Sequence, residues 1–476
     1  MGHFRYGGEP RGFTPANGGA AKDAPTTLSD FDTMIVPVDT GGGRPRNLWE
    51  MPQAMLYLIT DVAKYVLKSK SPMRVVVLTC GGLGPRCDTA VDDGFGLPVG
   101  CSLRGMLRCS RIENTHIPML QIDTDALTEP GRGVELAAQV ESELELSAPE
   151  VGFYNSTVDE QNRAIIYTSR EVAYRSDARF LPKLDLSARN PIFPGAKITP
   201  LVGRAAEGVA LITGGTGGLG LTTAEALVEA GVRTVVLSSR SGKVQRMNQG
   251  LSQTFERLAK MGADIIVEAC DVSDEQSCVD LLDRIRQRYG PVRWVFNAAG
   301  IVLPQEPENM AAVFAPKCEG SYYMHKHTLS DDIRAFVTYS SWSTGAGSED
   351  LHNYASANAY IDELCCLRHS MGRAATSIWF PEVEDAGMAA DMVMKGGKAN
   401  VPLPFVKQMF KQIICGKGPV APNMAILVQG YLIPRTVVMD SMLDPLRRRV
   451  NKQLYEQLQR QEQRIAGAGS EPKLVR

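Results

Sequence analysis

The fold is decided by the stretch VALITGGTGGLG, residues 209–220, which runs directly into the helix-forming residues 222–227. A glycine-rich turn between a buried strand and a helix lets backbone N–H groups and the positive end of the helix dipole face a pyrophosphate. The sequence therefore predicts a dinucleotide site in this turn. Its candidate contacts are Thr213, Gly214, Gly215, Thr216, Gly217, Gly218, Leu219 and Gly220.

Downstream of this turn, short apolar runs alternate with stretches of helical character. The expected strands are residues 209–213, 234–238, 264–267, 294–296, 335–339 and 376–379. This alternation is typical of parallel strands joined by crossover helices. We expect an α/β fold with six parallel strands in Rossmann-like, doubly wound order.

Upstream, the same alternation is weaker. Expected strands cover residues 34–38, 74–78 and 117–122, with helices near 49–67 and 103–112. A second glycine turn, Gly81 to Gly84, precedes Pro85 and an acidic loop, so a helix should not open there and we expect no bound anion. The first 200 residues are thus expected to form an α/β unit without a working site.

Composition narrows the classes of function. Charged residues make up 22% of the chain and the formal net charge is −2, so no charge excess favours nucleic acid or an anionic membrane. No 18-residue apolar run is present. Ten cysteines without a C-x-x-C pair and six histidines without ligand spacing predict reduced thiols, no metal site and a cytoplasmic location.

The cofactor type follows from the end of the second strand of this fold. NAD-selective sites place an acidic residue there for the ribose 2′-hydroxyl, whereas this chain has Ser239 and Arg240, which favour the 2′-phosphate of NADPH. Asp271 and Val272 follow the third strand and are expected at the adenine edge. Small residues after the fourth strand should allow close approach of the cofactor: Asn297, Ala298, Ala299 and Gly300.

Four further residues suggest a reduction. Ser341 ends a strand, and thirteen residues later Tyr354 opens a helix on which Asn358 lies one turn further along. Hydride reduction of a carbonyl needs a proton donor, and a phenol near pKa 10 needs a nearby cation to serve as one. Lys317 is the candidate cation, and Ser341 is expected to hold the substrate carbonyl.

Together these residues resemble the short-chain dehydrogenase/reductase superfamily, and in detail the ketoreductase domains of modular type I polyketide synthases. Most of that superfamily has a lysine four residues after the tyrosine; here Asn358 stands there, and Lys317 lies 24 residues before Ser341, as in those ketoreductases. Their PK-x-x-G and Y-x-x-A-N-A-x-x-D signatures match residues 316–320 and 354–362.

Three upstream segments, residues 100–108, 171–175 and 180–184, are similar to signatures of the truncated, cofactor-free Rossmann-like subdomain that precedes the catalytic one in this family. The glycines and prolines of residues 1–30 predict a flexible lead-in, and the charged residues near the C-terminus predict a solvated helix or linker over 441–476. The resemblance implies a structural subdomain over 31–200 and a catalytic NADPH-binding subdomain over 201–440.

The resemblance also implies an activity, which is NADPH-dependent reduction of a β-ketoacyl thioester carried on an acyl carrier protein, in polyketide biosynthesis. Acyl carrier protein and other synthase domains are the implied partners. Two alternatives stay open, namely the ketoreductase of a type I fatty acid synthase and a non-catalytic structural pseudo-reductase.

Departures from the family pattern limit what can be expected of the product. Residues 302–304 and Ala346 replace features tied to the face of hydride delivery, so the stereochemistry of the hydroxyl stays open. Trp379 is followed by Phe380 where the family often has glycine, and a substrate lid is expected to start at Gly387.

Overall fold

The computed structural model describes residues 33–38, 47–69, 73–83, 97–114, 117–146, 157–158, 164–165, 171–176, 178–180, 198–243, 251–381, 383, 401–415 and 423–425. Three predicted features lie outside these residues: the lead-in 1–30, the start of the lid at Gly387 and the charged helix or linker over 441–476. Below, the N-terminal unit means the described residues up to 180, and the C-terminal unit those from 198 onward.

The N-terminal unit contains a mostly parallel sheet in the order β1-β2-β3-β6-β7. Its strands are β1 (Thr33–Pro37), β2 (Arg74–Thr79), β3 (Met119–Thr124), β6 (Glu171–Arg175) and the antiparallel edge strand β7 (Ala178–Phe180). A separate two-stranded hairpin joins β4 (Thr157–Val158) to β5 (Ala164–Ile165). The prediction missed β6, because charged residues flank its three apolar ones and it reads as too short for a buried strand.

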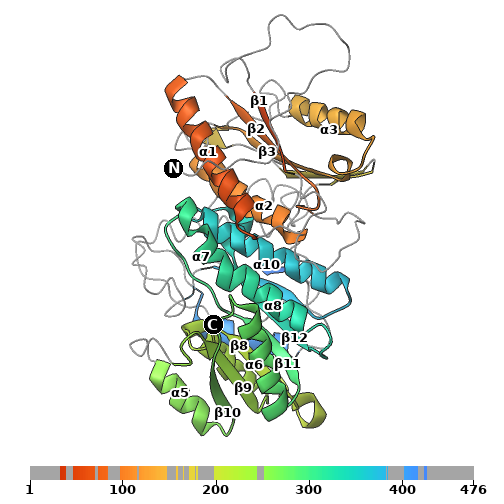
Figure 1. Ribbon diagram of the computed structural model, residues 1–476. Helices are drawn as coiled ribbons and strands as arrows, with labels where there is room; N and C mark the ends of the chain where they lie inside the picture. Colours follow the sequence, from red (N-terminus) through yellow and green to blue (C-terminus); the bar gives the residue numbers. More distant parts are fainter. Residues whose placement is uncertain are drawn as a thin grey trace, which may run out of the picture.

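Helices cover both faces of this sheet (Figure 1). On one face, α1 (Glu50–Ser69) and α2 (Leu97–Glu113) pack against Val75 and Val77 of β2. On the other, α3 (Gly133–Leu146) packs on Val76. α2 begins six residues before the expected helix at 103.

The C-terminal unit carries a seven-stranded sheet in the order β10-β9-β8-β11-β12-β13-β14. The strands are β8 (Val209–Thr213), β9 (Thr234–Ser239), β10 (Asp264–Ala269), β11 (Val292–Asn297), β12 (Ala335–Ser341), β13 (Thr376–Phe380) and β14 (Asn423–Ala425). All neighbouring pairs are parallel, so the predicted doubly wound Rossmann-like sheet is confirmed. The predicted number of six strands is wrong, because β14 has only three residues and gives no periodic signal.

Two helical layers sandwich this larger sheet. One consists of α4 (Gly218–Glu229), α5 (Leu251–Lys260) and α11 (Leu403–Cys415). The other consists of α6 (Glu275–Arg288), α7 (Met310–Phe314), a π-helical turn (Ala315–Glu319), α8 (Gly320–His327) and α10 (His352–Ser370). A short helix, α9 (Trp342–Ala346), follows β12 directly.

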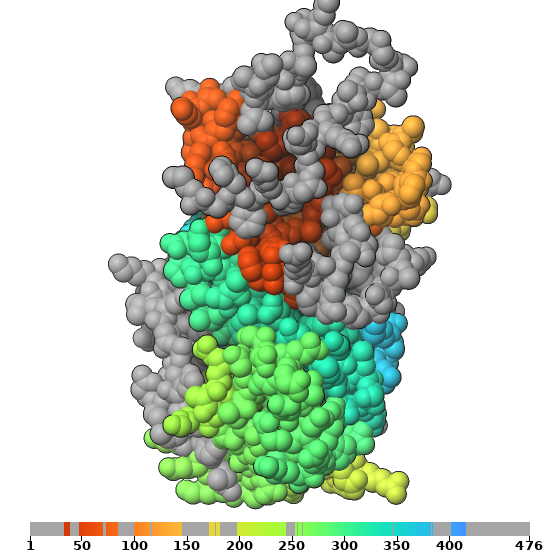
Figure 2. Space-filling model, viewed as in Figure 1, coloured from red at the N-terminus to blue at the C-terminus, as the bar shows by residue number. Residues whose placement is uncertain are grey.

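The two units share one hydrophobic core. Leu103 and Leu107 of α2 belong to the same buried cluster as Tyr360 and Leu364 of α10, and Figure 1 shows these helices side by side. Gly105 permits the contact, because a Cβ there would lie 2.2 Å from the Ala355 carbonyl oxygen. In Figure 2 the red and orange atoms of the N-terminal unit rest directly on the teal atoms of the C-terminal one. The units therefore form one body with a buried seam.

The two sheets differ in topology. In the C-terminal unit the chain runs from β8 outward to β10 and then crosses to β11, so the strand order reverses between β8 and β11. Ligands of open α/β sheets bind at such a reversal, outside the carboxyl ends of the strands. In the described N-terminal sheet the parallel strands β1, β2, β3 and β6 succeed one another in a single direction, which leaves no reversal point.

Candidate active site

The glycine turn after β8 forms an open cradle. Gly214 has φ of +64°, and a Cβ on it would lie 2.8 Å from Cα of Ala299, so only glycine fits. A Cβ on Gly220 would lie 2.6 Å from Cα of Gly215, where α4 packs against the turn. Among the described residues no side chain caps Gly217 at the start of α4. The first amides of α4 are thus available to an anion.

At the reversal point, the ends of β8 and β11 carry polar groups that fit a dinucleotide. The Thr213 hydroxyl donates to Oδ1 of Asn297 (3.3 Å), and the Ala298 amide donates to the Thr213 carbonyl (3.0 Å). Nδ2 of Asn297 is buried and meets no acceptor among the described residues. A buried donor beside a glycine cradle suits a polar ligand such as the expected nicotinamide dinucleotide.

The residues predicted to select NADPH lie along the same edge of the sheet. Arg240 is exposed immediately after β9, and the Ser239 hydroxyl donates to the Lys243 carbonyl (3.3 Å). After β10, Asp271 accepts from the Ser273 amide (3.0 Å), while Val272 is buried against Gly320. The structure therefore places the predicted adenine and 2′-phosphate contacts beside the cradle.

Lys317, Asn358 and Tyr354 form one hydrogen-bonded cluster. Nζ of Lys317 donates to Oδ1 of Asn358 (2.9 Å) and to the Tyr339 carbonyl (2.7 Å). Nδ2 of Asn358 donates to the Tyr354 carbonyl (2.8 Å), and Nζ lies 5.1 Å from the centre of the Tyr354 ring. Gly300 makes room for this lysine, since a Cβ there would lie 3.1 Å from its Cε.

Burial controls the titration of these groups. It lowers the pKa of Lys317 to about 8, so the ammonium stays charged at neutral pH. It raises the pKa of Tyr354, and a hydrogen bond involving Asn358 opposes that rise. The sequence argument expected the lysine to lower the tyrosine pKa, but desolvation of the phenol is the larger effect here.

Ser341 ends β12 and serves as the N-cap of α9. Its Oγ accepts from the Ser343 amide (3.2 Å) and from the Ser343 hydroxyl (3.0 Å). The side chain is partly exposed, so its own hydroxyl proton can point toward a carbonyl group. The position of Ser341 is thus fixed by the local geometry of α9.

A buried carboxylate behind the cluster was not among the predicted site residues. Asp362 accepts from the Ser377 hydroxyl (2.5 Å) and from Nε1 of Trp379 (2.8 Å), and burial raises its pKa to about 6. It anchors the Trp379 ring, which packs on Gly345 and lies 5.8 Å from the Trp342 ring. The spacing of residues 354, 358 and 362 along one helix face was the signal that could have identified it.

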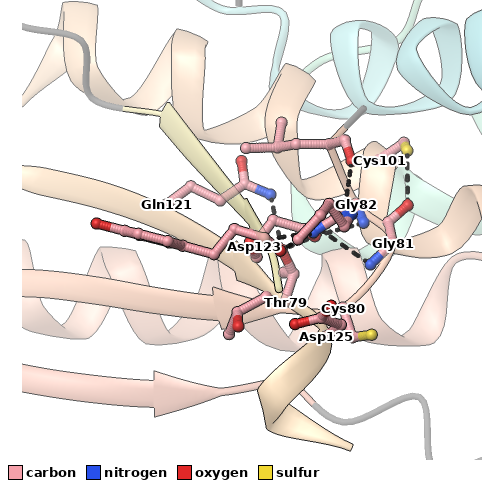
Figure 3. A network of polar contacts seen from close by, with 12 residues as sticks. Thr79, Cys80, Gly81, Gly82, Cys101, Gln121, Asp123 and Asp125 are labelled. Atoms are coloured by element: carbon pink, nitrogen blue, oxygen red, sulfur yellow. Dashed lines mark hydrogen bonds and ion pairs between the residues drawn. The ribbon is translucent and has the colours of Figure 1, made fainter. Parts of the chain in front are cut away.

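The glycine turn in the N-terminal unit is filled from within (Figure 3). The amides of Gly81 and Gly82 donate to the two carboxylate oxygens of Asp123, at 3.1 and 2.5 Å. The Thr79 hydroxyl (2.6 Å) and Nη2 of Arg175 (2.5 Å) donate to the same carboxylate. An internal carboxylate therefore takes up the amides that a phosphate would use.

Neither a cluster of metal-ligating side chains nor a membrane-spanning helix is found among the described residues. They contain no group of three or more His, Cys, Asp or Glu side chains placed to hold a metal ion. None of the helices in the described part of the chain combines the length and apolar character needed to cross a bilayer.

Comparison with known proteins shows what this chain is similar to. A sequence model of the KR domain matches residues 208–385. "Chalcone synthase cfoA" of Aspergillus candidus is 37% identical over 39% of this chain and 7% of its own length. "Phenolphthiocerol synthesis polyketide synthase type I Pks15/1" of Mycobacterium marinum is 32% identical over 46% of this chain and 10% of its own length. The chain thus spans only a small part of these large relatives.

Solved structures agree with the fold. "Structure of A-type Ketoreductases from Modular Polyketide Synthase" has a TM-score of 0.60 at 24% identity and covers 78% of this chain and 72% of that chain. "Crystal structure of a ketoreductase domain from the bacillaene assembly line" has a TM-score of 0.60 at 19% identity, with 84% and 93% covered. Residues 208–385 thus match the KR domain, and the chain has the fold of polyketide synthase ketoreductases.

Proposed function

We propose that this chain reduces a β-ketoacyl thioester to the β-hydroxyacyl thioester with NADPH, the thioester being carried on an acyl carrier protein. The observation that carries the proposal is the bonded cluster of Lys317, Asn358 and Tyr354, which Lys317 joins through the Tyr339 carbonyl to β12, the strand that ends in Ser341. KR domains bind a nicotinamide cofactor, and the open cradle after β8 fits one.

Each residue of the cluster has a role in this reaction. Ser341 donates a hydrogen bond to the β-carbonyl oxygen and holds it beside Tyr354. A nicotinamide cofactor held at the cradle after β8 would supply the hydride for the reduction of the carbonyl group. Tyr354 gives its phenolic proton to the oxygen as the negative charge develops there, and the ammonium of Lys317 stabilises the phenolate that remains. Asn358 keeps Lys317 in place.

NADPH is the proposed cofactor because no carboxylate stands at the end of β9. Arg240 is exposed there, and its guanidinium can form charge-assisted hydrogen bonds with a 2′-phosphate. Aspartate or glutamate at the same place would repel that phosphate. Ser239 adds a hydroxyl beside Arg240.

The proposed partner is an acyl carrier protein within a larger synthase. Relatives of this chain include multidomain polyketide synthases, such as the Mycobacterium marinum enzyme quoted above, of which this chain spans 10%. A carrier-bound substrate explains how a small reductase unit serves such an assembly.

The test is consumption of NADPH with a panel of β-ketoacyl N-acetylcysteamine thioesters, followed by chiral analysis of the products. These thioesters imitate the end of a phosphopantetheine arm. We expect NADPH oxidation with formation of one β-hydroxyacyl thioester enantiomer, and no oxidation without a keto substrate. Tight NADPH binding without oxidation by any member of the panel would overturn the proposal.

A further inference from the structure

A buried ion-pair cluster in the N-terminal unit reaches the active-site helix of the other unit. Arg108 of α2 donates from Nε and Nη2 to the two carboxylate oxygens of Glu171 on β6, at 2.8 and 2.5 Å. Arg111, one turn further along α2, donates to the same carboxylate (2.7 Å) and to the Met119 carbonyl (3.0 Å). All three side chains are at most 5% exposed.

The third nitrogen of the Arg108 guanidinium group, Nη1, forms a hydrogen bond outside this cluster. It donates to the Thr344 carbonyl of α9 (2.7 Å). A helix as short as α9 has no intrahelical partner for the carbonyls of its last turn, so this bond satisfies a group that would otherwise be buried without one. Thr344 lies three residues after Ser341, the N-cap of the same helix.

The surrounding packing makes α9 dependent on α2. Gly347, directly after α9, has φ of +77°, and a Cβ there would lie 2.6 Å from the Arg108 carbonyl oxygen. On its other side, α9 meets the Trp379 ring through Gly345. The short helix is thus held between Trp379 and α2, and its polar tie to α2 is Arg108.

Electrostatics make the Arg108 side chain a rigid support. Burial alone would raise the pKa of Glu171, but Arg108 and Arg111 bring it to about 2, so the carboxylate is ionised at any ordinary pH. A two-point bond to a fixed carboxylate leaves the guanidinium plane, and with it Nη1, in one orientation.

We propose that Arg108 is a positioning residue for the reduction: it fixes α9, and through α9 it fixes Ser341 against the substrate carbonyl. This inference rests on the proposed function, because Ser341 matters only if a carbonyl binds beside it. It gives the N-terminal unit an indirect part in the reaction, through α9. The misplacement of a reacting group by about 1 Å can cost about 100-fold in rate.

The test compares Arg108→Lys with Arg111→Lys. Both keep a positive charge beside Glu171, but a lysine ammonium lacks the planar fork needed to serve Glu171 and Thr344 together. We expect kcat/KM for the keto thioester to fall by about tenfold or more in Arg108→Lys and by less than about twofold in Arg111→Lys. NADPH affinity should be unchanged in both variants. Equal losses of kcat/KM would overturn the proposal.

A second measurement does not depend on turnover. Hydrogen exchange of the amides of residues 343–347 should be faster in Arg108→Lys than in the parent and in Arg111→Lys, while exchange in α4 stays the same. Equal protection of these amides in the three proteins would contradict the positioning role. If the parent reduces no thioester, the proposed function fails, and the exchange comparison still decides whether Arg108 holds α9.

Discussion

The glycine turn after β2 and the glycine turn after β8 look alike in sequence but differ in what their amides meet. In the first, the amides of Gly81 and Gly82 donate to the buried carboxylate of Asp123. In the second, no side chain of the described residues caps Gly217, and α4 begins with its amides available. One turn contains its own anion, and the other is open to one from outside.

The topology of the two sheets distinguishes the two glycine turns in the same way. The open turn lies where the strand order reverses between β8 and β11, and the filled turn lies in a sheet whose described parallel strands follow one direction. A glycine-rich turn is therefore a cofactor site only where the topology opens a crevice and no internal side chain fills it. The difference predicts that cofactor and chemistry belong to the C-terminal unit, and that the N-terminal unit acts through α2.

The largest expected effect is on the chemistry of the C-terminal unit. Tyr354→Phe should lower kcat by about 10²–10⁴-fold, because the general acid is lost, while NADPH affinity stays nearly unchanged. Steady-state kinetics and cofactor fluorescence measure the two quantities. Tyr360→Phe removes a hydroxyl from the same helix, at a side chain of the apolar cluster shared with α2, and should keep the parent rate. A Tyr354→Phe enzyme as fast as the parent would contradict the role of Tyr354 as the general acid.

The filled turn is expected to matter for stability. Asp123→Asn should lower the free energy of unfolding by about 3 kcal/mol, because it leaves Arg175 without its buried partner and turns an amide toward existing donors. Urea unfolding monitored by circular dichroism measures this. Asp125→Asn is the matched control, since Asp125 pairs with the more exposed Arg132 and should cost less than about 1 kcal/mol. Equal losses would show that the carboxylate does not hold the turn.

The next effect concerns the choice of cofactor at the open turn. NADPH should bind more tightly than NADH by about 1.5–3 kcal/mol, the contribution of hydrogen bonds to a charged group, and Arg240→Ala should remove most of that difference. Titration with both cofactors measures it. Arg233 precedes β9 at the opposite edge of the sheet, so Arg233→Ala should leave the preference intact. Full preference in Arg240→Ala would mean that the phosphate is held elsewhere.

The smallest effect is a shift in pH dependence. Reduction requires a protonated phenol, so the rate falls as the pH rises through the pKa of Tyr354. Lys317 loses its charge above its own pKa of about 8, which lies below the raised pKa of Tyr354, so loss of the ammonium should set the basic limb of the parent. Lys317→Ala should slow turnover and move the basic limb upward, to the pKa of Tyr354. Lys326→Ala, which removes one of the two α8 side chains that pair with Glu275 of α6, should leave the pH profile in place. A downward shift in Lys317→Ala would contradict this role.

Sequence predicts the parts of this molecule that are periodic or locally constrained. The strands from β8 to β13, the cradle and the spacing of Ser341, Tyr354 and Asn358 all follow from residues close together in the chain. The pairing of Lys317 with Asn358 was expected from the family resemblance, and in the structure Nζ of Lys317 lies 2.9 Å from Oδ1 of Asn358.

What sequence could not predict depends on contacts between distant segments. Asp123 reaches Gly81 from the neighbouring strand, and Arg108 lies 236 residues from Thr344. β6 and β14 are short and acquire their strand character from the strands beside them. The direction of the Tyr354 pKa shift also depends on burial, which no local pattern reveals.

The central claim is that only the glycine turn after β8 takes a dinucleotide, because it has no anion of its own. Calorimetric titration with NADPH tests it in the parent and in Gly218→Asp. The variant places a carboxylate at the first residue of α4, where the helix dipole tolerates it and Gly218 has no positive φ to preserve. We expect one NADPH per chain in the parent and no measurable binding in Gly218→Asp, with the same unfolding curve for both proteins. Two sites per chain in the parent, or parent affinity in Gly218→Asp, would contradict it.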